Sequence, residues 1–168
     1  MNAKELERCV ERYLSGEHEA FDEIYYETQK PVYLTLSTII KNKHTIEDLM
    51  QEVYIKAINN LESYKIGTNF SAWICTIARN HAINFYNRKK KETLVDSIED
   101  EYLFISESNS NSLLDKAMAI LDGMEKDIVF YHIVLNFKFK DISHILDIPL
   151  STIFFIYKKA LAKIKKEL

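Results

Sequence analysis

The chain has 168 residues with 3 Gly, 2 Pro and 2 Cys, a length that suits one domain or two small ones. So few Gly and Pro exclude a β-sandwich or β-barrel, because those folds need many tight turns, and 47% apolar residues exclude a disordered protein. The formal net charge of −3, taken alone, argues against a nucleic-acid binder.

Apolar residues recur with the 3.6-residue period of a helix along most of the chain. The first helix is expected to end at Ser15-Gly16, where glycine is a common helix stop. A second helix is expected from about residue 17 to residue 40. It should kink at Pro31, because proline removes an internal hydrogen bond.

A polar break at 41–44 precedes the third predicted helix. Thr45, with Asp48 three residues later, is a variant of the capping box and is expected to begin this helix. A loop at 62–69 follows, and the apolar period then resumes in a fourth helix over about 70–90.

Residues 92–112 are acidic, then rich in Ser and Asn, and have no helical stripe. A linker of about 20 residues is unusual inside one compact domain. We therefore expect an all-α fold of two small helical domains, at 1–91 and 113–168, joined by an acidic flexible linker.

The second domain is expected to open with Ser112 as helix cap and Asp115 at the third helical position, and Gly123 is expected to stop that helix. Three apolar-striped stretches follow, at 125–135, 138–146 and 150–167.

The last two stretches are joined by Asp147-Ile148-Pro149, which predicts a helix-turn-helix. Asn136 and Asp147 fall at sharp turns, and both residue types tolerate the left-handed conformation.

The net charge conceals a strong segregation along the chain. Residues 1–60 carry −4, residues 61–91 carry +5, residues 92–115 carry −7 and residues 116–168 carry +3. Two basic blocks are thus separated by an acidic one, and such asymmetry says more about partners than the total charge does.

Motifs for catalysis or metal binding are missing from the sequence. With 3 Gly there is no glycine-rich phosphate loop, and no Gly-x-Ser-x-Gly or His-Glu-x-x-His motif occurs. Cys9 and Cys75 form neither a metal pair nor a disulfide framework, which predicts a reducing compartment. We expect no enzyme, no metal and no cofactor. No apolar run approaches the ~20 residues that span a bilayer, so no membrane segment is expected.

The segment 70–91 combines aromatic, Thr and Asn side chains with a basic end. On a helix these residues share roughly one side, an arrangement that suits stacking on unpaired bases, reading of base edges and contact with phosphates. The equally weighted alternative is that Trp73 and Phe85 are core and that the basic run is a solvated helix end. The candidate residues are Trp73, Thr76, Asn80, Asn84, Arg88, Lys89 and Lys90.

Two further clusters are candidates for binding. Ser151 and Thr152, at the start of the last helix, can donate to a phosphate, and the later lysines can supply phosphate affinity, although helix-turn-helix pairs also occur as plain packing units. On the third helix three polar residues cluster on one side, where a solvated face is the favoured alternative. These clusters are Ser151, Thr152, Lys158 and Lys159, and Asp48, Gln51 and Glu52.

Taken together, the segments resemble an extracytoplasmic-function (ECF) sigma factor of bacterial RNA polymerase. The segments at 20–40, 46–64 and 70–91, with EDLMQEV and FSAWICTIARNHAINFYNRKKK among them, resemble region 2 of that group in order and spacing. Residues 113–153 resemble region 4 more weakly. The resemblance implies a non-enzymatic initiation factor that acts in the cytoplasm, and at the nucleoid when polymerase-bound.

The resemblance also implies roles for the candidate residues. Asp48, Gln51 and Glu52 would dock on the clamp coiled coil of the polymerase core. The loop at 65–69 and the helix at 70–91 would read and hold open the −10 promoter element. The linker would run through the polymerase interior near the RNA path.

Region 4 would dock on the polymerase flap and place its second helix in the major groove of the −35 element. The family commonly has Lys, Ser and Arg in the first turns of that helix, and these are replaced here by Phe154, Phe155 and Ile156. Phe155 is therefore expected to contact thymine methyls or a protein partner, and −35 recognition is expected to be unusual, weak or partly replaced.

Two alternatives remain open. One is a sigma-like regulator, or half of a split initiation factor, that needs a partner to recognise promoters. The other is a stand-alone helix-turn-helix regulator that binds duplex DNA without polymerase. The expected partners are the polymerase core and promoter DNA, and an anti-sigma factor or co-regulator is a further candidate.

Overall fold

The computed structural model describes residues 1–92 and 112–168, and the chain divides into two compact helical units. The predicted linker at 92–112 lies outside the described residues except for its two ends. Within the described residues every regular element is helical, as predicted. The helices of the first unit are α1 (Ala3–Leu14), α2 (Ala20–Ser37), α3 (Lys43–Asn59), a short 3₁₀ turn (Leu61–Ser63) and α4 (Phe70–Glu92).

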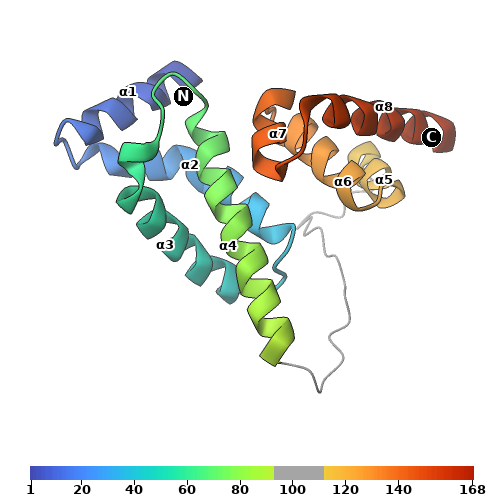
Figure 1. Cartoon of the computed structure of the whole chain (residues 1–168), viewed down its shortest axis with the longest axis horizontal. Coiled ribbons are helices and arrows are strands. Elements are labelled where there is room, and N and C mark those ends of the chain that lie inside the picture. The colour runs from blue at the N-terminus through green and yellow to red at the C-terminus, as the bar shows by residue number, and fades with distance from the viewer. Residues whose placement is uncertain (93–111) are drawn as a thin grey trace. The chain divides into compact units, whose positions relative to one another are not determined.

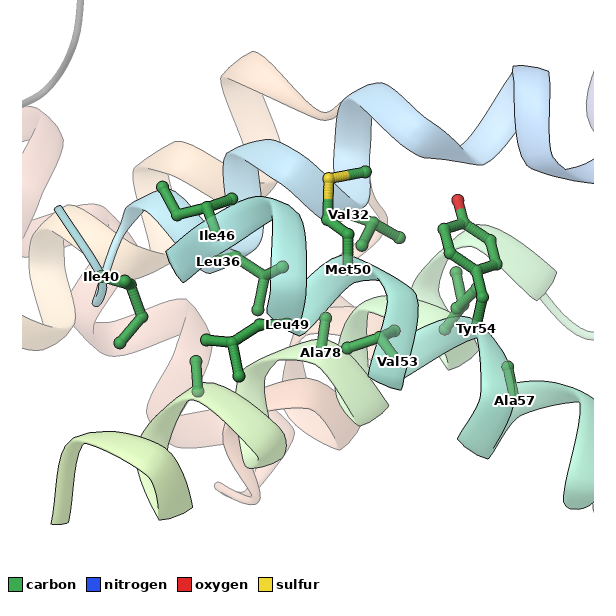
Figure 2. Packing of buried hydrophobic residues seen from close by; sticks show 12 residues of the cluster. Val32, Leu36, Ile40, Ile46, Leu49, Met50, Val53, Tyr54, Ala57 and Ala78 are labelled. Carbon is green, nitrogen blue, oxygen red and sulfur yellow. The ribbon is translucent and has the colours of Figure 1, made fainter. Parts of the chain in front are cut away.

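In the first unit α2, α3 and α4 pack against one another, and α1 packs on α2 (Figure 1). Buried apolar residues from α2, α3 and α4 form the main core. Figure 2 shows Leu49 and Val53 of α3 beside Ala78 of α4, where the small side chain lets the two helices approach closely. A second cluster joins α1 and α2 to the start of α4 and includes Val10, Tyr64 and Phe70.

The start of α3 differs from the sequence prediction. This helix begins at Lys43, and its cap is Asn42 rather than Thr45. The side chain of Asn42 accepts a hydrogen bond from the backbone N–H of Thr45 at 3.1 Å. The predicted cap at Thr45 is therefore wrong, because Asn42 caps the first turn three residues earlier than expected.

The second unit comprises α5 (Leu113–Ile120), α6 (Gly123–Val129), a π-helical turn (Phe130–Val134), α7 (Phe139–Leu146) and α8 (Leu150–Glu167). The helix α8 packs against α5, α6 and α7 (Figure 1). Apolar side chains from these helices make the core, including Ile128, Ile142 and Ile153, which are fully buried. This packing leaves one long side of α8 exposed.

The prediction at Ser112 is confirmed and the prediction at Gly123 is wrong. The Ser112 hydroxyl accepts from the backbone N–H of Asp115 at 3.2 Å, as expected for a cap. Gly123 does not stop α5. That helix ends at Ile120, and Gly123, with a φ of 40°, is the first residue of α6. Asp122 has extended backbone and caps α6. The break that we predicted at Gly123 alone therefore involves Leu121, Asp122 and Gly123.

The turn between α7 and α8 follows the sequence expectation. Asp147 has a φ of 53° and Asn136 a φ of 56°, so both residues adopt the predicted left-handed conformation. The backbone N–H of Ile148 donates to the carbonyl of Ser143 at 3.1 Å, which closes the end of α7. The two helices are thereby joined by three residues, 147–149.

Candidate functional surfaces

The three predicted polar residues of α3 lie on one exposed side of that helix. Asp48, Gln51 and Glu52 are all exposed, opposite the buried stripe that faces α2 and α4. Ile55, one turn further along, is 59% exposed on the same side. Ile55 could have been found from the sequence, because it is an apolar residue that falls outside the core stripe of its helix.

A buried histidine of α4 supports this surface. His81 is 5% exposed, and its Nε2 donates to the carboxylate of Glu52. Its Nδ1 lies 2.8 Å from Nζ of Lys56, the donor on the other side of the ring. The contact ties α4 to α3 and orients the Glu52 carboxylate. No local sequence pattern predicts the contact between His81 and Glu52, since 29 residues separate them.

The predicted residues of α4 divide into exposed and half-buried groups. Asn80, Asn84 and Arg88 are exposed and recur every four residues on one side of the helix, followed by the exposed Lys89 and Lys90. The ammonium group of Lys89 lies 3.4 Å from the Glu92 carboxylate and 5.7 Å from the centre of the Phe85 ring. This side of α4 therefore offers amide groups followed by cations.

Trp73 and Thr76 lie deeper than the asparagines. Both are half-buried, and the Thr76 hydroxyl donates to the carbonyl of Ala72 at 2.9 Å. The centre of the Trp73 ring lies 5.3 Å from that of Tyr64 and 5.5 Å from that of Phe70. The indole touches both core clusters of the first unit. Packing therefore accounts for one part of its surface and leaves another part accessible.

We expect Trp73→Ala to lower the free energy of unfolding by about 3 kcal/mol, because it removes a large ring that packs against both clusters. Asn84→Ala, an exposed position on the same helix, should change it by less than ~0.5 kcal/mol. Denaturant titration followed by far-ultraviolet circular dichroism measures both changes. A loss below ~1 kcal/mol for Trp73→Ala would show that the indole contributes little to the core.

The predicted residues of α8 occupy its exposed side near the start of the helix. Ser151 is exposed and Thr152 is half-buried, both in the first turn. Phe154 is 50% exposed and Phe155 is 70% exposed, so neither of the two adjacent rings is buried. The Phe154 ring leans on α7, with its centre 4.9 Å from that of Phe139. Phe155 thus projects from α8 without such a neighbour in the described residues.

The lysines of α8 differ in their surroundings. Lys158 and Lys159 are both exposed, one turn beyond Phe154 and Phe155. The Lys159 ammonium lies 3.9 Å from the carboxylate of Glu125 on α6, and Lys163 lies 3.1 Å from the same carboxylate. The acid draws these cations toward the body of the second unit, so any anion that binds Lys159 competes with Glu125.

Neither cysteine sits in an activated environment. Both are free and buried, and burial raises the pKa of the Cys75 thiol to about 12. Within the described residues no three His, Cys, Asp or Glu side chains are grouped so that they could hold a metal ion. No helix among these residues is long and apolar enough to cross a membrane.

Comparisons with known proteins agree with the sequence resemblance. Residues 24–92 match the family model of sigma-70 region 2. The ECF RNA polymerase sigma factor SigW of Bacillus subtilis is 25% identical over 166 residues, covering 88% of each chain. SigM of the same organism, also an ECF sigma factor, is 28% identical over 134 residues, covering 76% of this chain and 82% of SigM.

Two solved structures share the fold. The sigma factor RpoE of Bartonella quintana, solved with the anti-sigma factor NepR, has a TM-score of 0.69 at 20% identity and covers 87% of this chain and 94% of its own. CnrH, solved with the cytosolic domain of CnrY, has a TM-score of 0.67 at 14% identity and covers 95% of this chain and 94% of its own. The region 2 match, which begins within α2 and runs through α3 and α4, and the relatives along most of the chain show that this protein is similar to the ECF RNA polymerase sigma factors.

Proposed function

We propose that this protein binds the RNA polymerase core through the exposed side of α3 and directs it to promoters, whose −10 element is held open by α4 and the loop before it. The observation that carries the proposal is the column of exposed Asn80, Asn84 and Arg88 on α4, inside the region 2 match. Such a helix presents hydrogen-bonding amides to base edges and cations to the backbone.

Promoter opening in this scheme needs no catalytic side chain, and a sigma factor is not an enzyme. The duplex and the open strand are in equilibrium, and a protein that binds the open strand better shifts that equilibrium by its difference in affinity. The half-buried Trp73 and Thr76 lie at the beginning of the same side of α4, next to the loop. Their place suits them to border the bound strand while Arg88, Lys89 and Lys90 hold phosphates.

For the −35 element we propose that α8 enters the major groove with Ser151 and Thr152 near phosphates and with Lys158 and Lys159 beside the backbone. Phe155 then faces base edges, where an apolar side chain recognises the methyl group of thymine. The high exposure of Phe155, beside lysines that suit a polyanion, favours DNA over an apolar protein surface at this position.

Replacing thymine by deoxyuridine in the −35 element removes that methyl group alone. We expect polymerase carrying this protein to bind the substituted promoter about threefold to fivefold more weakly, which corresponds to one lost methyl contact. Phe155→Ala should abolish the difference between the two promoters, and Leu161→Ala, an exposed apolar residue on the same helix, should retain it. If Phe155→Ala still distinguished the two promoters as well as the wild type does, Phe155 would not contact the thymine methyl group.

The function is tested by combining the purified full chain with core polymerase and genomic DNA and by mapping the 5′ ends of the transcripts. The proposal expects a stable complex with core and transcripts from a small set of sites that depend on this chain. Absence of core binding or of dependent transcripts would refute it. We place the protein in the cytoplasm, and at the nucleoid when it is bound to polymerase.

The same experiment separates the alternatives. Transcription that appears only with an added partner would indicate half of a split initiation factor, the alternative that the replacement of the usual residues by Phe154 and Phe155 raises. Tight binding to duplex operators without core would indicate a stand-alone regulator. An anti-sigma factor is a further proposed partner, because RpoE, which shares the fold, was solved with one.

A further inference from the structure

A carboxylate of the first helix reaches the loop that precedes α4. The Tyr64 hydroxyl donates to Glu7, 2.7 Å from Oε2 and 3.0 Å from Oε1, across 57 residues of sequence. The backbone N–H of Gly67 donates to Oε1 of the same carboxylate at 2.5 Å. Glu7 is half-buried and Tyr64 is buried, so these bonds lie partly out of water, where an ionised acceptor strengthens them.

The loop itself is closely organised around these two bonds. The Tyr64 hydroxyl also lies 3.2 Å from the carbonyl of Thr68, and the Thr68 hydroxyl donates to the carbonyl of Lys65 at 2.7 Å. Gly67 has a φ of 92°, which a residue with a side chain rarely adopts. The backbone is held from inside, while the side chains of Lys65 and Ile66 remain exposed, Ile66 by 41%.

We infer that Glu7 is a positioning residue that sets the shape of the strand-binding loop 64–69, so that α1, which lies before the region 2 match, takes part in promoter opening. The inference rests on the proposed function. A loop already held in one conformation loses little entropy when DNA binds, whereas a loop released from Glu7 must be ordered by the DNA itself. Glu7 acts through Tyr64 and Gly67 and need not touch the DNA.

The first test measures the loop without DNA. Amide hydrogen exchange of the full chain should show the Gly67 N–H exchanging ~10-fold or more faster in Glu7→Ala, because a bond to a charged acceptor is lost. Amides in the core of α3 should keep their wild-type rates. Glu11→Ala, an exposed position on the same helix, should leave Gly67 unchanged. Unchanged exchange at Gly67 in Glu7→Ala would overturn the inference whatever the DNA experiment shows.

The second test measures binding of polymerase carrying this protein to the single-stranded −10 segment of a promoter mapped as above. Glu7→Ala should weaken binding by ~10-fold at unchanged affinity for core, while Glu7→Gln, whose amide oxygen still accepts a hydrogen bond, should recover most of the loss. Equal losses in the two variants, a wild-type affinity in Glu7→Ala, or a parallel loss of core binding would overturn the inference. Failure of the wild type to bind the strand would instead refute the proposed function and leave the exchange experiment as the test of Glu7.

Discussion

Reversing the charge of Asp48 and Glu52 together to Lys is expected to weaken binding to the polymerase core by ~100-fold or more. Both carboxylates are exposed on one side of α3, with Gln51 between them and Ile55 beyond. Truncating a central interface residue costs about 2–4 kcal/mol, which is roughly 30-fold to 1,000-fold in affinity. A reversed charge adds repulsion from whatever cations the partner presents.

The Glu52 change also places a lysine beside His81 and Lys56, so folding must be checked separately. Asp48→Lys alone avoids that contact and should by itself weaken core binding by ~10-fold. The matched control changes Glu11 of α1 and Glu19, the residue before α2, to Lys. Both are exposed acids, so the control alters the net charge by the same amount. Affinity for core is measured by competition with labelled wild-type protein. Wild-type affinity in a folded double variant would show that this side of α3 does not bind core.

Removing the basic end of α4 is expected to have the second largest effect. Changing Arg88, Lys89 and Lys90 together to Ala should weaken promoter binding by polymerase carrying this protein on the order of 100-fold near physiological salt. Three phosphate contacts to single-stranded DNA release about two counterions. The negative slope of log affinity against log salt concentration should therefore become less steep by about two. Binding to core should be unchanged, since these residues lie on another helix from Asp48 and Glu52.

The salt slope separates a contact with DNA from an effect on folding. A variant that merely loses stability loses affinity at every salt concentration without a change of slope, whereas lost phosphate contacts flatten the slope. The control changes Lys4, Arg8 and Lys30, which are exposed on α1 and α2, and should leave both affinity and slope near wild type. An unaltered slope in the Arg88, Lys89 and Lys90 variant would show that these residues do not contact the phosphates of the promoter DNA.

Several features of the fold could be predicted because they depend on neighbours along the chain. The apolar period located the helices of both units, Ser112 was recognisable as a cap, and Asn136 and Asp147 were recognisable as left-handed residues. The two wrong predictions, the helix cap at Thr45 and the helix stop at Gly123, also concern residues that are neighbours in the sequence. Asn42 and Thr45 are both good caps, and nothing in the pattern decides which of them comes first.

The candidate surfaces divide in the same way. Helical spacing alone put Asp48, Gln51 and Glu52 on one side of α3 and aligned Asn80, Asn84 and Arg88 on α4, because side chains three and four residues apart share a helix face. For Trp73 spacing left two readings, core or surface. The structure combines them, since the indole packs against both clusters and is still only partly buried.

By itself, then, the sequence determined an all-helical chain, its breaks and the polar composition of each helix face, since these follow from residue type and a fixed period. Only the tertiary structure decided which distant groups meet. His81 reaches Glu52 across 29 residues, and Glu7 reaches Tyr64 and Gly67 across 57 and 60. Such contacts have no sequence period, because the packing of α1 and α4 against the rest of the first unit brings them together.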